Sequence, residues 1–221
     1  MHNTKSLVRI ILALFILVLC VSCGVSGGGG GGASPSSNHS PAADDPTQNY
    51  FSIDNTEAAS NYSNYGSGYK GICIYYKIYT NASTIITHYN VINAESTGAG
   101  GVSKLEGYTY RKLNGADYII PSSQTNQTVE IRLFDETSYT KGIKVDGNSI
   151  DTPKRYFSNK TFQFSSTEYP ETGDGDFNDT QTTTGPWFVA AYAVSVSQSE
   201  TSLIPDVFSK PKYLGYIKIY Y

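Results

Sequence analysis

Cysteine is scarce in this chain of 221 residues, which has three in total. Cys20 and Cys23 stand close together at the end of an apolar amino-terminal run, so Cys73 is the only cysteine in the rest of the chain. A single cysteine excludes an internal disulfide and a multi-cysteine metal site there. Cys73 has no catalytic motif beside it, so we expect a small buried thiol and not a nucleophile.

Histidine and basic residues are sparse as well. Beyond the first residues the chain has only His39 and His88, and His88 lies within Ile-Ile-Thr-His-Tyr, which predicts a strand. No Gly-x-Ser-x-Gly, His-Glu-x-x-His or phosphate-loop motif is present, so we expect a protein that is not an enzyme. The formal net charge of −3 and the lack of basic runs argue against nucleic acid as a partner.

A long hydrophobic run is also missing. The apolar stretch 10–19 is shorter than the roughly 20 residues that a membrane-spanning helix needs. Lys5 and Arg9 precede it, and small residues follow it. A positive flank, a short apolar core and a small-residue cleavage site predict an export signal over residues 1–22.

The residues around Cys23 add a lipid anchor to this prediction. Val21 and Ser22 precede Cys23 and Gly24 follows it. This stretch resembles the bacterial lipobox in the relaxed form of spirochaete lipoproteins, with Cys20 where leucine is usual. The resemblance implies cleavage before Cys23 and lipidation of its thiol. It also implies a protein anchored in the cell envelope, at the periplasmic or the surface face of the outer membrane.

The segment after Cys23 is rich in glycine, serine and proline, and six consecutive glycines occupy positions 27–32. Glycine and serine make a chain flexible, and proline disfavours helix and sheet. We therefore predict a disordered tether over residues 23–48. Residues 49–221 are then enough for a single domain with its own core.

Tyrosine is unusually frequent, with 19 residues, and short alternating segments separated by turn residues recur along the chain. We predict an all-β domain, an antiparallel β-sandwich that resembles immunoglobulin and fibronectin-type domains in architecture. The Asp146-Gly147 pair predicts a hairpin turn with a return through Ile150. The expected strands are 72–79, 85–92, 128–134, 143–145, 161–164, 187–196 and 214–221, with a short helical turn within 102–113.

Two of these strands carry tyrosine and lysine on one face. If the strands share a sheet, these side chains form a platform that suits protein or glycan, because tyrosine offers rigid amphipathic contact area. The alternative is ordinary cross-strand packing on a solvated sheet. The six residues are Tyr75, Lys77, Tyr79, Tyr216, Lys218 and Tyr220.

The segment Glu171-Thr-Gly-Asp-Gly-Asp-Phe-Asn-Asp179 alternates oxygen-bearing side chains with glycine. Calcium prefers six to eight such oxygen ligands on a flexible loop. The run is similar to the Gly-Asp-x-Asp-Phe-Asn-Asp motif of some bacterial lipoprotein and surface domains, and the resemblance implies calcium binding. A solvated acidic loop is the alternative. The candidate ligands are Glu171, Asp174, Asp176, Asn178 and Asp179.

These features predict a lipid-anchored module that binds or adheres to an envelope protein or a glycan, or serves as an accessory subunit. Two alternatives stay open. A glycan-acting envelope hydrolase would use paired carboxylates, whose spacing the sequence does not reveal. A small outer-membrane β-barrel would use the alternating residues 215–221 as its closing strand.

Overall fold

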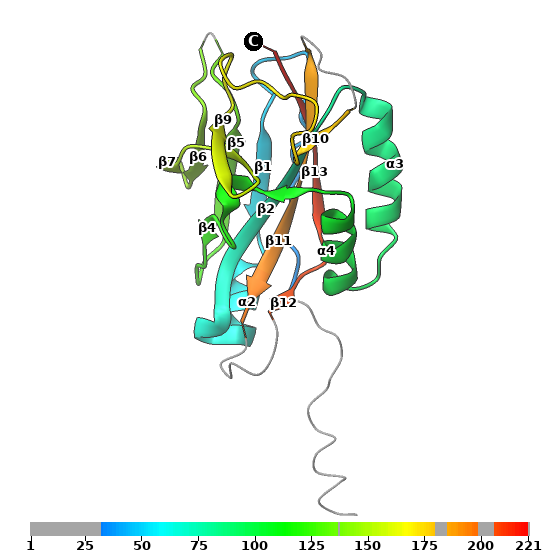
Figure 1. Cartoon of the computed structure of the whole chain (residues 1–221). Coiled ribbons are helices and arrows are strands. Elements are labelled where there is room, and N and C mark those ends of the chain that lie inside the picture. The colour runs from blue at the N-terminus through cyan, green and yellow to red at the C-terminus, as the bar shows by residue number, and fades with distance from the viewer. Residues whose placement is uncertain (1–31, 137, 180–184, 199–205, 221) are drawn as a thin grey trace, which may run out of the picture. The chain divides into compact units, whose positions relative to one another are not determined.

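The chain folds as a β-sandwich with helices on the outer face of one sheet (Figure 1). The computed structural model describes residues 32–136, 138–179, 185–198 and 206–220. The small sheet has the order β1-β5-β6-β7 and is antiparallel throughout. The large sheet has the order β10-β2-β11-β12; β13 also pairs with β11, and β3 and β4 pair with β2.

The strands of the two sheets differ greatly in length. The small sheet contains β1 (Phe51–Asn55), β5 (Gln127–Arg132), β6 (Gly142–Val145) and β7 (Asn148–Asp151). The large sheet contains β2 (Tyr69–Tyr79), β3 (Arg111–Lys112), β4 (Ile120–Pro121), β10 (Phe177–Asn178), β11 (Trp187–Ser197), β12 (Val207–Phe208) and β13 (Lys212–Ile219). A separate hairpin pairs β8 (Lys154–Phe157) with β9 (Lys160–Gln163).

The core between the sheets follows the predicted alternation. Ile72, Ile74, Tyr76 and Ile78 of β2 all face it, as expected. They meet the inward side chains of β1, β5 and β6 from the small sheet. The strand β11 lies between β2 and β13 and is buried almost throughout, which confirms the prediction of a central strand covered on both faces.

The predicted hairpin turn is also present. Asp146 and Gly147 connect β6 to β7 with φ values of 50° and 78°. Positive φ at both central residues is the geometry of the type I′ turn that Asp-Gly favours. The turn therefore fixes the register of the hairpin, as the sequence indicated.

The segment predicted as a strand over 85–92 is a helix. It belongs to α3 (Ala82–Asn93), whose first turn is capped by the Asn81 side chain accepting from the Ser83 N–H at 2.8 Å. Its β-branched residues disfavour a helix only weakly, and burial of Ile85 and Ile92 on one face outweighs that preference.

A second helix completes this cover. The helical turn expected within 102–113 belongs to α4 (Gly98–Gly107), which begins at the capping residue Thr97. Together α3 and α4 bury the outer face of β2 and β11 in a second core, which is rich in tyrosine. The helices α2 (Ala58–Tyr65), η2 (Gly66–Gly68) and η3 (Leu113–Gly115) complete the described elements.

The predicted tether is wrong for residues 32–48, which lie against the domain. Ser36 forms a β-bridge with Asp54 of β1. The side-chain amide of Asn61 in α2 accepts from the Ala33 N–H and donates to the Ala33 carbonyl. Backbone groups satisfied by side chains let a segment without large apolar residues dock. Residues 23–31 lie outside the described residues.

Candidate ligand pocket and the arginine network behind it

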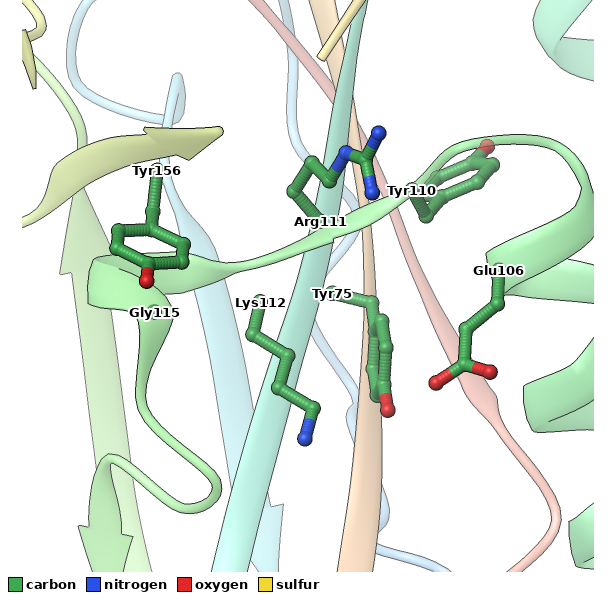
Figure 2. Close-up of a pocket in the computed structure, with 7 residues that line it drawn as sticks. All are labelled: Tyr75, Glu106, Tyr110, Arg111, Lys112, Gly115 and Tyr156. Carbon is green, nitrogen blue, oxygen red and sulfur yellow. The ribbon is translucent and has the colours of Figure 1, made fainter. Parts of the chain in front are cut away.

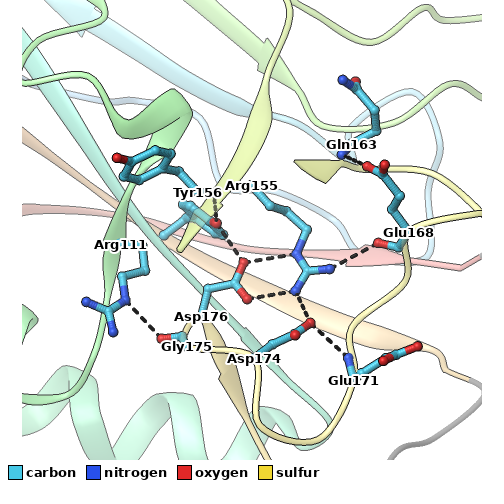
Figure 3. A network of polar contacts seen from close by, with 10 residues as sticks. Arg111, Arg155, Tyr156, Gln163, Glu168, Glu171, Asp174, Gly175 and Asp176 are labelled. Carbon is cyan, nitrogen blue, oxygen red and sulfur yellow. Dashed lines mark hydrogen bonds and ion pairs between the residues drawn. The ribbon is translucent and has the colours of Figure 1, made fainter. Parts of the chain in front are cut away.

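The acidic segment after Glu171 folds around an arginine of β8. The Arg155 guanidinium donates to Asp176 through Nε (2.9 Å) and Nη2 (2.7 Å), and to Asp174 through Nη2 (2.6 Å) (Figure 3). Its Nη1 donates to the Glu168 carbonyl at 3.0 Å. Burial alone would lower the pKa of Arg155. Its hydrogen bonds to the two carboxylates outweigh the effect of burial and raise that pKa. The guanidinium therefore stays charged.

The network also engages the sandwich core. The Tyr76 hydroxyl donates to Asp176 at 2.6 Å and accepts from the Tyr156 N–H at 2.7 Å. Burial and then the Asp176 charge raise the pKa of Tyr76, which keeps its proton. On the other side of the loop, the carbonyl of Gly175 accepts from Arg111 Nε at 3.0 Å. The loop thus ties together β2, β3 and β8.

The carboxylates of Asp174 and Asp176 are both bonded to Arg155, so a guanidinium lies where calcium was predicted to bind. Asn178 lies in β10 beside β2, and Asp179 accepts from the Thr80 hydroxyl. Glu171 contributes its N–H to Asp174 at 3.0 Å. Within the described ranges no group of three or more His, Cys, Asp or Glu side chains is placed to hold a metal ion.

A pocket of about 370 Å³ lies on the outer face of the large sheet (Figure 2), and it shares Arg111 and Tyr156 with this network. Tyr75 and Tyr110 are buried, and Tyr156 forms a half-exposed wall. Glu106 reaches in from the last turn of α4. The lining residues are Tyr75, Glu106, Tyr110, Arg111, Lys112, Gly115 and Tyr156.

The wall residue Tyr156 is positioned from two sides. Its backbone is held by Tyr76, as described above. Its ring packs on Gly115, where a Cβ atom would lie 2.7 Å from the ring and where φ is 68°. Only glycine accepts both the close contact and this backbone conformation without strain.

The charges of the pocket have distinct partners. Lys112 Nζ lies 2.6 Å from the exposed carboxylate of Asp117. Arg111 is tied through Nε to Gly175, and Glu106 is exposed. Burial raises the pKa of Tyr75, with a smaller contribution from nearby negative groups, so this hydroxyl remains protonated. The pocket therefore offers neutral hydroxyls, cationic groups and one carboxylate within a tyrosine frame.

The predicted tyrosine and lysine platform is not available to a partner on its β2 side. Both strands do share one sheet, but β11 lies between them. Tyr75, Lys77 and Tyr79 are at most 4% exposed, because they face the second core beneath α3 and α4. On β13, Tyr216 packs partly against the second core and Lys218 pairs with Asp44, and Tyr220, just after the strand, is exposed.

The remaining predicted residues have structural partners. His88 lies on α3, where its Nδ1 is 2.8 Å from the Tyr79 hydroxyl and its ring stacks on Tyr108. Burial, and next the charge of Lys77, lower the pKa of His88. Cys73 is free and buried, as expected, and burial raises the pKa of its thiol to about 12. Cys23 lies outside the described residues.

The pocket residues Glu106, Arg111, Lys112 and Tyr156 were not identified from the sequence. They come from α4, β3 and β8, and no local motif links them. The glycine at 115 was the one available signal, because glycine often marks a close approach.

Comparisons with known proteins returned no match to a family model, to a curated protein or to a solved structure. Among the described residues no helix is both long and apolar enough to cross a membrane.

Proposed function

We propose that this chain is a lipid-anchored module of the cell envelope that binds a protein segment or a glycan through the pocket between α4, β3 and β8. Support for the location comes from the export signal and from Cys23 in its lipobox-like setting. Cleavage there would leave eight residues, 24–31, between the lipid-bearing cysteine and Gly32, the first residue that the structure describes. Such a short spacer would keep the domain close to the membrane surface.

One observation carries the binding role: a pocket that is framed by tyrosines and lined by charges of both signs lies next to a buried network of hydrogen bonds. Tyrosine and arginine are enriched at contact sites, where they supply area and hydrogen bonds at low entropic cost. The buried Arg155 network holds the wall residues Arg111 and Tyr156 from behind. A preformed wall avoids the cost of ordering side chains when a ligand binds.

The test is binding of envelope glycans and of envelope-derived peptides to the whole chain, compared with the Tyr156→Ala variant. Loss of a ring at the pocket wall is expected to weaken binding at least about tenfold. Tyr118→Ala is the matched control, since Tyr118 is 46% exposed and does not line the pocket. Equal affinity for both variants and the parent chain would place the contact site elsewhere.

A glycan-acting hydrolase is the second candidate, favoured by the carboxylate of Glu106 in the pocket. Glycosidases use two carboxyl groups in most families, and Glu106 is the one carboxylate among the lining residues described. Incubation of the same glycans with the parent chain and with Glu106→Gln separates the candidates. Turnover that the substitution abolishes would replace the binding role with a catalytic one.

A further inference from the structure

A second pocket, of about 660 Å³, lies where β2 ends and α3 begins. The short strand β10 runs parallel to β2 at this point and forms one side of it. The segment 108–112 separates it from the tyrosine-framed pocket, because Thr109 lines one and Tyr110 the other. The lining residues are Lys77, Thr80, Asn81, Thr84, Thr109, Phe177, Asn178 and Asp179.

Lys77 is the least expected member of this lining. It is 4% exposed, yet its ammonium donates to two uncharged oxygens, the Tyr108 carbonyl (2.5 Å) and the Thr109 hydroxyl (2.6 Å). No ion pair to Lys77 occurs among the described residues. A buried cation without a counterion is costly, and two of its three N–H groups are accounted for. The ammonium also lies 5.9 Å from the centroid of the Tyr79 ring, and Lys77 lines the pocket.

The other lining groups both donate and accept hydrogen bonds. Three threonine hydroxyls and the amides of Asn81 and Asn178 are groups of this kind, although the Thr80 hydroxyl already donates to Asp179 and the Asn81 oxygen already accepts from the Ser83 N–H. The Asp179 carboxylate, which accepts from the Thr80 hydroxyl, lines the same pocket. Phe177 lines the pocket as well, but it is 7% exposed and packs in the core between the sheets.

We infer that this second pocket binds the hydroxyl groups of a neutral glycan. Sugar hydroxyls donate and accept at once, and so match a lining of hydroxyls and amides. An anion such as phosphate would be attracted by Lys77 but repelled by Asp179. A diamine would be attracted by Asp179 but repelled by Lys77. A neutral polyhydroxylated ligand avoids both penalties. This assignment is independent of the tyrosine-framed pocket.

The experiment is a binding titration followed by backbone amide signals in NMR. The whole chain is titrated with neutral oligosaccharides of hexoses, N-acetylhexosamines and 6-deoxyhexoses, and separately with inorganic phosphate and 1,4-diaminobutane. We expect at least one neutral glycan to bind and to shift the signals of Thr80, Thr109 and Asn178. Binding of none of them, or stronger binding of phosphate or the diamine, overturns the inference.

Thr84→Ala and Thr87→Ala form a matched pair on α3 for this titration. Thr84 lines the pocket, whereas Thr87 is exposed and its hydroxyl donates to the Ser83 carbonyl. Thr84→Ala should weaken glycan binding about fivefold, the value of one hydrogen bond, and Thr87→Ala should not. Tyr156→Ala should leave this titration unchanged, which separates it from the proposed function. Equal effects of the two threonine variants would contradict the site.

Discussion

Arg155 and Asp176 face each other through two parallel hydrogen bonds, of 2.9 Å and 2.7 Å, with side chains that are 1% and 0% exposed. A bidentate pair of this kind fixes both the distance between the guanidinium and the carboxylate and their relative orientation. Because Arg155 lies in β8 and Asp176 immediately precedes β10, the pair joins the separate hairpin to the large sheet. The wall of the tyrosine-framed pocket depends on this junction.

Asp176→Asn should therefore lower the free energy of unfolding by about 3 kcal/mol or more, because it leaves part of a buried guanidinium charge uncompensated. Urea denaturation measures the change. Asp117→Asn is the same substitution in the pair with Lys112, where the carboxylate is 81% exposed. Its cost should stay below about 1 kcal/mol. Similar costs for the two variants would show that the buried pair does not hold the hairpin.

Calcium provides a second test of the same loop. If Arg155 takes the position of a cation, calcium and a chelator should give the parent chain the same melting temperature. Arg155→Ala removes the positive charge and leaves Asp174 and Asp176 facing each other, so calcium should raise the melting temperature of this variant. Differential scanning calorimetry with and without chelator decides. A calcium-dependent rise in the parent chain would support the calcium prediction made from the sequence.

Local patterns predicted the strands of this fold well and the site poorly. The alternation in 72–79 and the apolar run 187–196 each depend on neighbouring residues, so a sequence shows them directly. The sequence of α3 suggests a strand because it is rich in β-branched residues. The capping residue Asn81 is the local signal that favours a helix instead.

The candidate site depends on contacts between distant segments. The acidic residues near 174–176 suggested a metal, whereas their cation is Arg155, about twenty residues earlier in the chain. Neither spacing nor composition reveals such a partner. The same holds for residues 32–48, whose docking depends on side chains such as Asn61 and Arg132.

The pH dependence of stability should reveal Lys77. Burial, and then the charge of Arg111, lower the pKa of Lys77 from 10.5 to about 8. Between these two values the unfolded chain binds more protons than the folded chain, so the contribution of Lys77 becomes more favourable as pH rises. Below pH about 8 Lys77 is charged in both states, so the full cost of burying its charge lowers the stability of the folded chain.

Urea denaturation of the parent chain and of Lys77→Met, from about pH 7 to about pH 9.5, isolates this contribution from tyrosine titration, which begins near pH 10. The stability of the parent chain relative to Lys77→Met should increase with pH over this range. A constant difference would mean that Lys77 titrates as an ordinary exposed lysine.

Two glycines at opposite ends of α4 should respond differently to alanine. A Cβ at Gly98 would lie 1.8 Å from the Phe208 carbonyl oxygen, whereas a Cβ at Gly107 meets nothing within 4 Å. Gly98→Ala should destabilise the fold by about 2 kcal/mol or more, because helix and strand must separate. Gly107→Ala should be neutral or stabilising by up to about 1 kcal/mol, since alanine favours a helix. Thermal unfolding of both variants tests how closely α4 docks.

The final prediction concerns the segment before β1. Arg132 of β5 lies between the rings of Tyr50 and Tyr139, at 4.5 Å and 4.3 Å, and its Nη groups donate to the carbonyls of Pro46 and Thr47 at 3.0 Å and 3.1 Å. In the intact fold Arg132 is 6% exposed. A chain that begins at Asn49 lacks both of these carbonyl acceptors. Each hydrogen bond from a charged donor is worth about 1.5–3 kcal/mol.

Urea denaturation should therefore show a chain beginning at Asn49 to be less stable than one beginning at Gly32 by about 3 kcal/mol or more. The same truncation in the Arg132→Met background should cost less, because no buried donor is then left without its acceptor. This double-mutant cycle separates the hydrogen bonds of Arg132 from the general packing of residues 32–48. Equal costs in both backgrounds would assign the stabilisation to packing alone, and no cost in either would make the segment a tether after all.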